Sequence, residues 1–311
     1  MRGPGPSDSP PSRAAIGIPT YRRPQKLLRL LTSLEPSLRA FPAQVLVADN
    51  ACDQETRQVV AAFSERWPRT LYLPVPERGI SAARNALIGA FLAAKDPAPW
   101  LAMLDDDLAV GADWLERMLA AAEHGGAGFD AVGAPYATGK TSLSFVVRNS
   151  IFVKRPRMPS GPCAPLSAAG NILLSRGLLA RMPAPHFLPA YGLSGGEDYD
   201  FFRRAAGMGA RFAWCDEAFA EEDVDLDRLS AGAVFNRYYS TGNYMALIDR
   251  THEGVGRVWR RHLGGIFKAL GIGAAGLARL DRERALRGLF LTLFTLGALM
   301  GLAGFRVHRY R

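Results

Sequence analysis

Residues 100–107 read WLAMLDDD, a short apolar run that ends in three consecutive aspartates. An apolar run of this length bounded by polar residues is typical of a strand that is buried on both faces of a sheet. Similar short runs before and after it alternate with segments of helical periodicity. This order predicts βαβ units, and therefore an α/β fold with a mostly parallel sheet flanked by helices.

The alternation extends over most of the chain before residue 215. We expect strands at residues 14–18, 44–48, 70–75, 100–104, 131–135, 170–174 and 211–215. We expect helices at residues 24–34, 54–66, 81–94, 113–123 and 197–206, and a helical tail after residue 227. Residues 136–165 break the alternation and are rich in Gly, Pro and basic residues, so we interpret them as a variable insertion that faces the substrate.

The composition is that of a folded protein with one large domain and an appendage. Of 311 residues 48% are hydrophobic, and the formal net charge is +9. A chain of this length and hydrophobic content can bury a sizeable core, which excludes disorder for most of it. The charge favours an anionic partner such as a phosphorylated substrate, a phospholipid surface or nucleic acid. The three cysteines, Cys52, Cys163 and Cys215, lie far apart and provide neither a disulfide framework nor a metal knuckle.

The two ends of the chain differ from its centre. Residues 1–13 are rich in Pro, Ser and Gly and lack the apolar run of a secretory signal, so we expect a flexible tail and a catalytic part in the cytosol. Residues 288–305 read GLFLTLFTLGALMGLAGF, without a charge and with arginines on both sides. Such a run is near the lower limit of about 18 residues for crossing a bilayer, and a buried core helix is the alternative.

The segment before this run has a different character. Residues 264–280 keep Lys268 and Arg279 among apolar residues, which is typical of a helix that lies in the membrane interface. Together the two segments predict a C-terminal membrane anchor whose orientation the flanking arginines leave open.

Polar residues follow three of the expected strands at the end where ligands collect in open α/β sheets. They are residues 19–23 (PTYRR), residues 49–50 and the three aspartates. No G-x-G-x-x-G follows the first strand and no G-x-x-x-x-G-K-[ST] occurs, so neither motif is available to hold phosphates. Consecutive carboxylates predict a Mg²⁺ or Mn²⁺ site that would neutralise a departing nucleoside diphosphate; a turn capped by aspartate is the alternative.

Residues 195–200 (GGEDYD) form a second group of candidate site residues, in which two glycines precede a run of carboxylates. Glycines let the backbone approach a ligand closely. We interpret Asp198 as the general base that deprotonates the acceptor hydroxyl, with Glu197 as the second choice. A plain helix cap is the alternative.

Residues 77–85 (ERGISAARN) form a third group of candidate site residues, in which a glycine turn leads into a helix. Arg78 and Arg84 could face an anion there. Solvated surface arginines are the alternative.

In this order, the segments IGIPTYRR, VLVADNACD, ERGISAARN, LDDD, AGNILLS and YGLSGGEDYDFFRR resemble the inverting glycosyltransferases of family 2, which have the GT-A fold. The resemblance covers residues 14–227. The GGED segment followed by a helix with Phe and Arg is similar to the succinoglycan-type glucosyltransferase branch.

The resemblance implies a role for most of these residues. Asp49 would contact the base, usually uracil, and Asp198 matches the catalytic base. Pro19, Thr20 and Tyr21 would line the nucleoside, with Arg78 and Arg84 near the nucleoside or phosphates. Asp105 and Asp107 would take the outer positions of the Asp-x-Asp motif, with Asp107 as the direct metal ligand and Asp105 or Asp106 as the ribose contact. Another acid near the active site falls among Glu221, Glu222 and Asp223, without a fixed register.

The implied organisation is a flexible tail (1–13), a GT-A domain (14–227), a helical linker region (228–263) and membrane-associating helices (264–311). Residues 233–239 read AVFNRYY in place of the Q-x-x-R-W of processive synthases, so we expect addition of a single sugar. Arg237 would face the acceptor or belong to a packed amphipathic helix. The predicted reaction is metal-dependent transfer from a UDP-sugar to a lipid-linked saccharide, at the cytoplasmic face of the inner (plasma) membrane, in cell-surface polysaccharide assembly.

Two other functions fit parts of this pattern. A sugar-nucleotide pyrophosphorylase would need a Gly-rich basic loop after the first strand, of which PTYRRP is a poor version. A non-catalytic membrane scaffold would not need both acidic segments. A nucleic-acid binder is disfavoured because much of the positive charge surrounds the apolar tail and forms no recognition motif.

Overall fold

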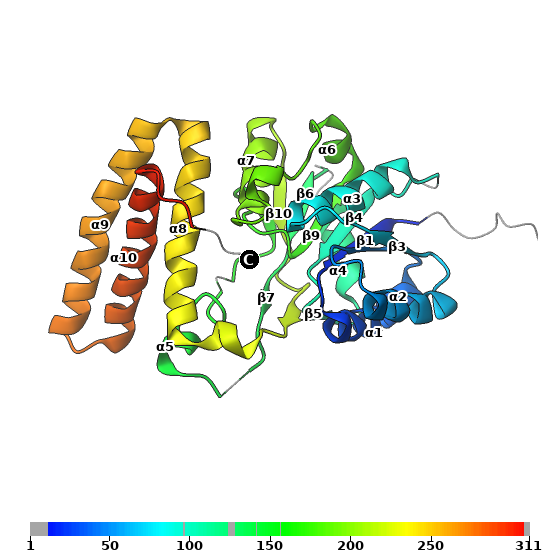
Figure 1. Ribbon diagram of the computed structural model, residues 1–311, viewed down its shortest axis with the longest axis horizontal. Helices are drawn as coiled ribbons and strands as arrows, with labels where there is room; N and C mark the ends of the chain where they lie inside the picture. The colour runs from blue at the N-terminus through cyan, green and yellow to red at the C-terminus, as the bar shows by residue number, and fades with distance from the viewer. Residues whose placement is uncertain (1–11, 96, 124–127, 141, 156, 308–311) are drawn as a thin grey trace, which may run out of the picture.

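The computed structural model of the chain describes residues 12–95, 97–123, 128–140, 142–155 and 157–307. They form an α/β domain and a layer of three long helices, α8 to α10, that lies beside it (Figure 1). The α/β domain extends from β1, at Ala14, to the short helix η3, which ends at Leu229. The predicted α/β architecture with a helical C-terminal part is therefore confirmed.

An eight-stranded sheet forms the centre of the α/β domain, in the order β3-β2-β1-β4-β9-β6-β10-β8. Strands β1 to β4 run parallel, whereas β9 is antiparallel to both of its neighbours and β8 is antiparallel to β10. The sheet is therefore parallel on one side and mixed on the other. Its strands are β1 Ala14–Thr20, β2 Gln44–Asp49, β3 Thr70–Pro74, β4 Trp100–Leu104, β6 Ala131–Gly133, β8 Gly161–Cys163, β9 Asn171–Ser175 and β10 Phe212–Trp214.

Helices cover both faces of this sheet because the strands alternate their side chains between two hydrophobic cores. Ile16 and Ile18 of β1 belong to the core under α1, α2 and α4. Ala15 belongs to the core on the opposite face, which α3, α6 and α7 cover. The helices are α1 Pro24–Ala40, α2 Gln54–Arg66, α3 Ile80–Ala93, α4 Trp114–Glu123, α6 Arg176–Arg181 and α7 Glu197–Gly207.

The register brings the polar ends of β1, β2 and β4 to one edge of the sheet. Thr20 at the end of β1 is paired with Asp49 at the end of β2, and Gly17 is paired with Met103 of β4. The three aspartates that follow β4 therefore lie beside the residues that follow β1.

Shorter elements frame this edge. A second sheet has the order β5-β11-β7, and β5 follows the three aspartates directly. The expected insertion at residues 136–165 contains β7, α5 and β8. The remaining elements are β5 Leu108–Val110, β7 Tyr136–Ala137, β11 Ala220–Glu222, α5 Phe145–Arg148, η2 Pro189–Tyr191 and η3 Leu226–Leu229.

Glycines allow the helices of the helical layer to pack closely. Its helices are α8 (Ala231–Glu253), α9 (Val255–Ala278) and α10 (Arg282–Leu302). A Cβ on Gly297 of α10 would lie 1.9 Å from a backbone oxygen of α8, and a Cβ on Gly288 would lie 2.4 Å from the Cα of an α9 glycine. Helix α10 is thus in backbone contact with both neighbours, at a distance that only glycine permits.

Among the described residues, α10 is the one helix that is long and apolar enough to cross a membrane, judged by length and composition. In its most apolar stretch, 44% of the residues are buried within the protein. The division expected between residues 263 and 264 falls inside α9, which is one continuous helix.

Candidate active site

One cavity of about 660 Å³ lies at the carboxyl ends of β1 and β4, between the α/β domain and α8. Four separate segments of the chain bring predicted site residues to it. Three of them follow the parallel strands β1, β3 and β4, which end at the same edge of the sheet, and the fourth opens α7. The predicted residues that line the cavity are Pro19, Thr20, Tyr21, Arg78, Arg84, Asp105, Asp106, Asp107, Glu197 and Asp198.

Asp49 is not among the residues that line this cavity. Its buried carboxylate accepts hydrogen bonds from the backbone nitrogens of Ala51 (2.9 Å) and Asp53 (3.0 Å) and from the hydroxyl of Tyr72 (2.8 Å). These bonds shape the turn after β2, and the next residue, Asn50, faces the cavity. The contact of Asp49 with a nucleobase stays a prediction.

Asp105 owes its position to a neighbouring glycine. Its backbone nitrogen donates to the carbonyl oxygen of Gly170 at 3.0 Å. A Cβ at Gly170 would lie 2.6 Å from Oδ2 of Asp105. The position of Asp105 therefore requires a glycine at residue 170, at the start of the AGNILLS segment.

Asp106 and Asp107 are buried beside a cation from the end of β1. Thr20 Oγ1 donates to Asp106 at 2.8 Å, and Arg23 Nη1 lies 3.4 Å from Asp106 and 3.3 Å from Asp107. Burial and three neighbouring carboxylates raise the pKa of Asp107 to about 7. A further cation at this position would stabilise the ionised carboxylate.

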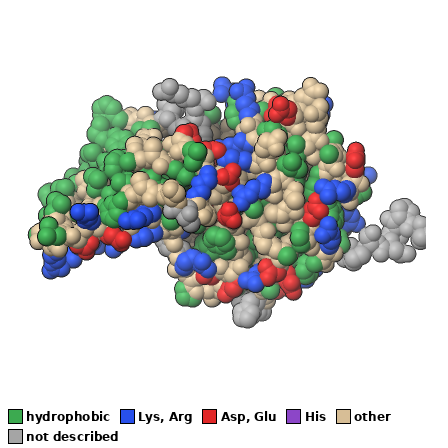
Figure 2. All heavy atoms as spheres, turned by 90° about the horizontal axis from the view of Figure 1, so that it is seen from below, with side chains coloured by type: hydrophobic (Ala, Val, Ile, Leu, Met, Phe, Trp, Pro, Cys, Tyr) green, Lys and Arg blue, Asp and Glu red, His purple; other side chains and the backbone are tan. Residues whose placement is uncertain are grey.

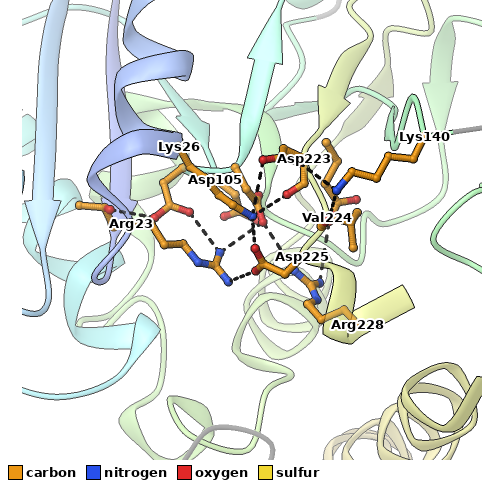
Figure 3. A network of polar contacts seen from close by, with 12 residues as sticks. Arg23, Lys26, Asp105, Lys140, Asp223, Val224, Asp225 and Arg228 are labelled. Atoms are coloured by element: carbon orange, nitrogen blue, oxygen red, sulfur yellow. Dashed lines mark hydrogen bonds and ion pairs between the residues drawn. The ribbon is translucent and has the colours of Figure 1, made fainter. Parts of the chain in front are cut away.

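Positive side chains join these aspartates to the segment between β11 and η3, as Figure 3 shows. Arg23 Nη2 lies 2.9 Å from Asp225, and Lys26 contacts the same carboxylate. Arg228 lies 3.6 Å from Asp107. Arg23 and Arg228, from two distant parts of the sequence, therefore both contact Asp107, and Lys26 pairs with Asp225 beside them.

Arg84 lies between the two acidic segments. Its Nη1 is 2.6 Å from Glu197 and its Nη2 is 3.1 Å from Asp105. Although burial lowers it, these carboxylates raise the pKa of Arg84 above its ordinary value. Two of its three nitrogens are used by carboxylates, so its predicted contact with the nucleoside or phosphates stays a prediction.

Glu197 and Asp198 open α7 at the other side of the cavity. The cap position is occupied by Gly196, whose φ is 95°, so neither carboxylate is the helix cap. A Cβ there would lie 2.5 Å from the ring of Tyr244 in α8. Burial and Asp198 raise the pKa of Glu197 to about 7, and burial raises the pKa of Asp198 as well. Carboxylates of this kind are suited to accept a proton near neutral pH.

Helix α8 forms a wall of the cavity. Arg237 lines it, and no described residue forms a hydrogen bond or an ion pair with its guanidinium, although the Nε is buried. Against the effect of burial, Arg84 and Arg237 lower the pKa of Asp198. The side chain of Arg237 therefore lies at the cavity.

Comparison with known proteins identifies the chain. The sequence profile of Glycosyl transferase family 2 matches residues 15–179, more than half of the chain. The chain belongs to glycosyl transferase family 2. The succinoglycan biosynthesis protein ExoM of Rhizobium meliloti (strain 1021) is 30% identical over 297 residues, which are 94% of this chain and 93% of that protein. The resemblance seen in the sequence is confirmed, and this family 2 glycosyltransferase is an enzyme.

Solved structures of glycosyltransferases share its fold. The mannosyltransferase PcManGT of Pyrobaculum calidifontis, in complex with GDP-Man and Mn²⁺, has a TM-score of 0.57 at 15% identity over 95% of this chain and 90% of that one. Residues 1–349 of S. aureus TarS, in complex with UDP, have a TM-score of 0.53 at 16% identity over 94% and 92% of the two chains. The chain spans 39% of a longer TarS structure. At these identities the likeness shows the fold alone.

The acidic cluster of this glycosyltransferase fits a metal that arrives with a phosphorylated ligand. Among the residues that the structure describes, no group of three or more His, Cys, Asp or Glu side chains is placed to hold an ion. Mg²⁺ and similar cations use one or two carboxylates together with substrate phosphates. The oxygen donors after β4 and the raised pKa of Asp107 fit that mode.

Several residues of the site had no role in the sequence analysis. Arg155 lies 2.8 Å from Glu222 and 3.8 Å from the ring centroid of Tyr136, while Arg23 and Arg228 contact Asp107. Arg23 follows β1 within PTYRR, so its place at a strand end could have indicated it. Arg155 and Arg228 lie outside the longer helices and strands, where no periodicity indicates the direction of a side chain.

Proposed function

We propose that this glycosyltransferase moves a single sugar, with inversion, from a UDP-sugar to a hydroxyl of a lipid-linked saccharide. The observation that carries the proposal is the pair of acidic segments at one cavity, with Arg84 in contact with both. The name of ExoM supports assembly of a succinoglycan-like surface polysaccharide. The UDP complex of TarS supports the nucleotide, and the GDP-Man complex of PcManGT makes GDP the alternative.

On the donor side, we assign the nucleoside to the residues that follow β1 and β2. Arg78 is exposed at the cavity, where no described residue pairs with it, so its charge is available to a diphosphate. The nucleoside contacts are Pro19, Thr20 and Tyr21, with Asp49 at the base and Asp105 or Asp106 at the ribose.

Asp107 and Asp105 would hold a divalent cation, Mg²⁺ or Mn²⁺, together with the diphosphate. When bound, this cation supplies positive charge that stabilises the leaving nucleoside diphosphate. Arg23 and Arg228 form ion pairs with Asp107, and donor binding would exchange these ion pairs for contacts with phosphate.

On the acceptor side, Asp198 accepts the proton of the acceptor hydroxyl. The hydroxyl oxygen forms a bond to the anomeric carbon while the bond from that carbon to the diphosphate oxygen breaks, and the electron pair leaves with the diphosphate. Glu197 is held by Arg84, so we assign the role of the base to Asp198. Glu197, whose pKa is raised, is its neighbour.

Family membership argues against the two other functions. A sugar-nucleotide pyrophosphorylase has no use for a base opposite the donor. A scaffold would not need two buried carboxylates of raised pKa, which are costly to maintain.

The test is calorimetric titration of the detergent-purified protein with UDP-, GDP- and dTDP-sugars, with and without Mn²⁺. We expect one UDP-sugar to bind in a metal-dependent way and Asp107→Ala to weaken its binding by at least about tenfold. Asp113→Ala, which removes an exposed carboxylate outside the cavity, is the matched control and should bind normally.

Transfer is then measured with the radiolabelled form of the donor that binds and with bacterial membranes. We expect the label to enter the lipid-extractable fraction. Metal-independent donor binding, preference for a GDP-sugar, or label that stays in the aqueous phase would each contradict the corresponding part of the proposal.

A further inference from the structure

Helix α9 carries an exposed apolar stripe that the active site does not use. Leu263, Phe267, Leu270 and Leu277 are between 46% and 74% exposed. Their spacing of four, three and seven residues puts them on one face of the helix. Buried residues such as Val258 and Ala269 occupy another face, toward the rest of the layer. The stripe is therefore not the face that packs α9 into the protein.

The apolar surface continues beyond α9. Leu280, in the turn before α10, is 90% exposed, and Leu289 and Leu296 of α10 are each 43% exposed. Figure 2 shows hydrophobic side chains gathered over the helical layer, with Lys and Arg along its edge. A patch of this kind with a charged rim marks an interaction surface.

The charge of the layer is strongly positive. Residues 255–302 contain eight Lys or Arg and two Asp or Glu. Both acids are engaged, since Asp281 caps α10 and Glu283 pairs with Lys154. By contrast, no ion pair within the described residues involves Arg257, Arg260, Lys268, Arg279, Arg282 or Arg287. This unpaired charge fits an anionic surface.

Helix α10 is long enough to span a bilayer over its full length, but its uncharged part is short and the helix packs tightly against its neighbours. Its uncharged part, from Gly288 to Leu302, has a length of about 22 Å at 1.5 Å per residue, against a hydrocarbon core of about 30 Å. At Gly297, α10 is also in close contact with the backbone of α8. Asn236 and Arg237 of α8 line the cavity. Spanning would draw these polar groups toward hydrocarbon.

We propose that the helical layer docks on an anionic phospholipid bilayer as a monotopic surface. Helix α9 lies in the interface, with its apolar stripe among the acyl chains and its unpaired basic side chains at the lipid phosphates. The opposite side of the layer, α8, forms a wall of the active cavity. The membrane surface is thus bound by the same layer that borders the site, and this holds whichever donor and acceptor the enzyme uses.

The test is flotation of the full chain with vesicles of phosphatidylcholine alone or mixed with phosphatidylglycerol. We expect binding to the mixed vesicles. Phe267→Ser with Leu277→Ser should lower partitioning by more than about tenfold. Arg257→Gln, Arg260→Gln and Lys268→Gln together should do the same on the mixed vesicles. The matched control, Leu71→Ser with Met208→Ser, alters two exposed apolar residues of the α/β domain and should bind normally.

Several results would overturn the proposal. They are equal binding to neutral and mixed vesicles, wild-type binding by both α9 variants, or the same loss in the control. Resistance to alkaline carbonate extraction would instead indicate a spanning helix. Concentration-dependent dimers that the Phe267 variant abolishes, without vesicle binding, would assign the patch to a second copy. Calorimetry with the donor on the same variants separates these results from a failed donor assignment, because the patch lies outside the cavity.

Discussion

Arg84 Nη1 lies 2.6 Å from Glu197 Oε1, and both side chains are buried. The same guanidinium contacts Asp105 at 3.1 Å, so one cation joins the acidic segment after β4 to the one that opens α7. A buried ion pair is weak evidence for stability, because desolvation offsets its attraction. Its effect here is positional, since it fixes the distance between the proposed metal side and the proposed base.

Replacing Arg84 should destabilise the protein strongly. Arg84→Ala leaves Glu197 and Asp105 without this partner, and we expect a loss of about 3–5 kcal/mol in the free energy of unfolding, measured by thermal and urea denaturation. Arg84→Met combined with Glu197→Gln should recover much of that stability without recovering transfer. If the double variant transferred sugar normally, the positional role would be wrong.

Asp198→Asn should abolish transfer while donor binding is retained. Removing a general base costs on the order of 10³-fold in rate, and the change is isosteric, so the fold should persist. The measurement is kcat for transfer together with donor calorimetry. Glu197→Gln is the matched comparison: a larger loss of kcat there than in Asp198→Asn would exchange the two assignments.

The charge of Arg237 should set the acidic limb of the pH profile. Burial raises the pKa of Asp198, while Arg84 and Arg237 lower it. Arg237→Gln therefore raises this pKa further, and the base is deprotonated only at higher pH. We expect the acidic limb of kcat/KM to move to higher pH in Arg237→Gln and to stay in place in Arg237→Lys. The limb belongs to the Glu197–Asp198 pair as a unit; a shift to lower pH would contradict the electrostatic argument.

Gly170→Ala should impair the donor site. The new Cβ would lie 2.6 Å from Oδ2 of Asp105, so the carboxylate must move away from its contact with Arg84. We expect weaker metal-dependent donor binding and a lower melting temperature. Gly177→Ala is the control, because its nearest neighbour is 4.0 Å away and alanine favours a helix. Equal effects of the two changes would show that the site does not depend on this close approach.

Gly297→Ala should disrupt the helical layer. Its Cβ would lie 1.9 Å from the backbone oxygen of Tyr239, so α10 would have to separate from α8. We expect reduced stability and increased proteolysis of the layer. Gly271→Ala, which meets open space in α9, should be neutral or stabilising. Wild-type stability of the Gly297 variant would mean that the α8–α10 contact does not hold the layer together.

The sequence by itself determined the α/β fold and ten of the residues that line the cavity. Apolar runs such as WLAML predict strands because a strand that is buried on both faces of a sheet must be apolar. Parallel strands must also end at one edge of the sheet. The aspartates after β4 could therefore be assigned to the ligand-binding edge of the sheet, and the resemblance to family 2 implied that the carboxylates of GGED belong to the same site. Family membership followed from the same motifs.

Only the tertiary structure decided which side chains meet. The contacts of Arg23 and Arg228 with Asp107, and of Arg155 with Glu222, join segments that lie far apart in the sequence and have no shared periodicity. The sequence likewise did not predict the hydrogen bonds of Asp49 or the packing of α10 between α8 and α9. The physical reason is that strand and helix patterns record burial along one element, whereas pairing between charges depends on distances across elements that no local pattern encodes.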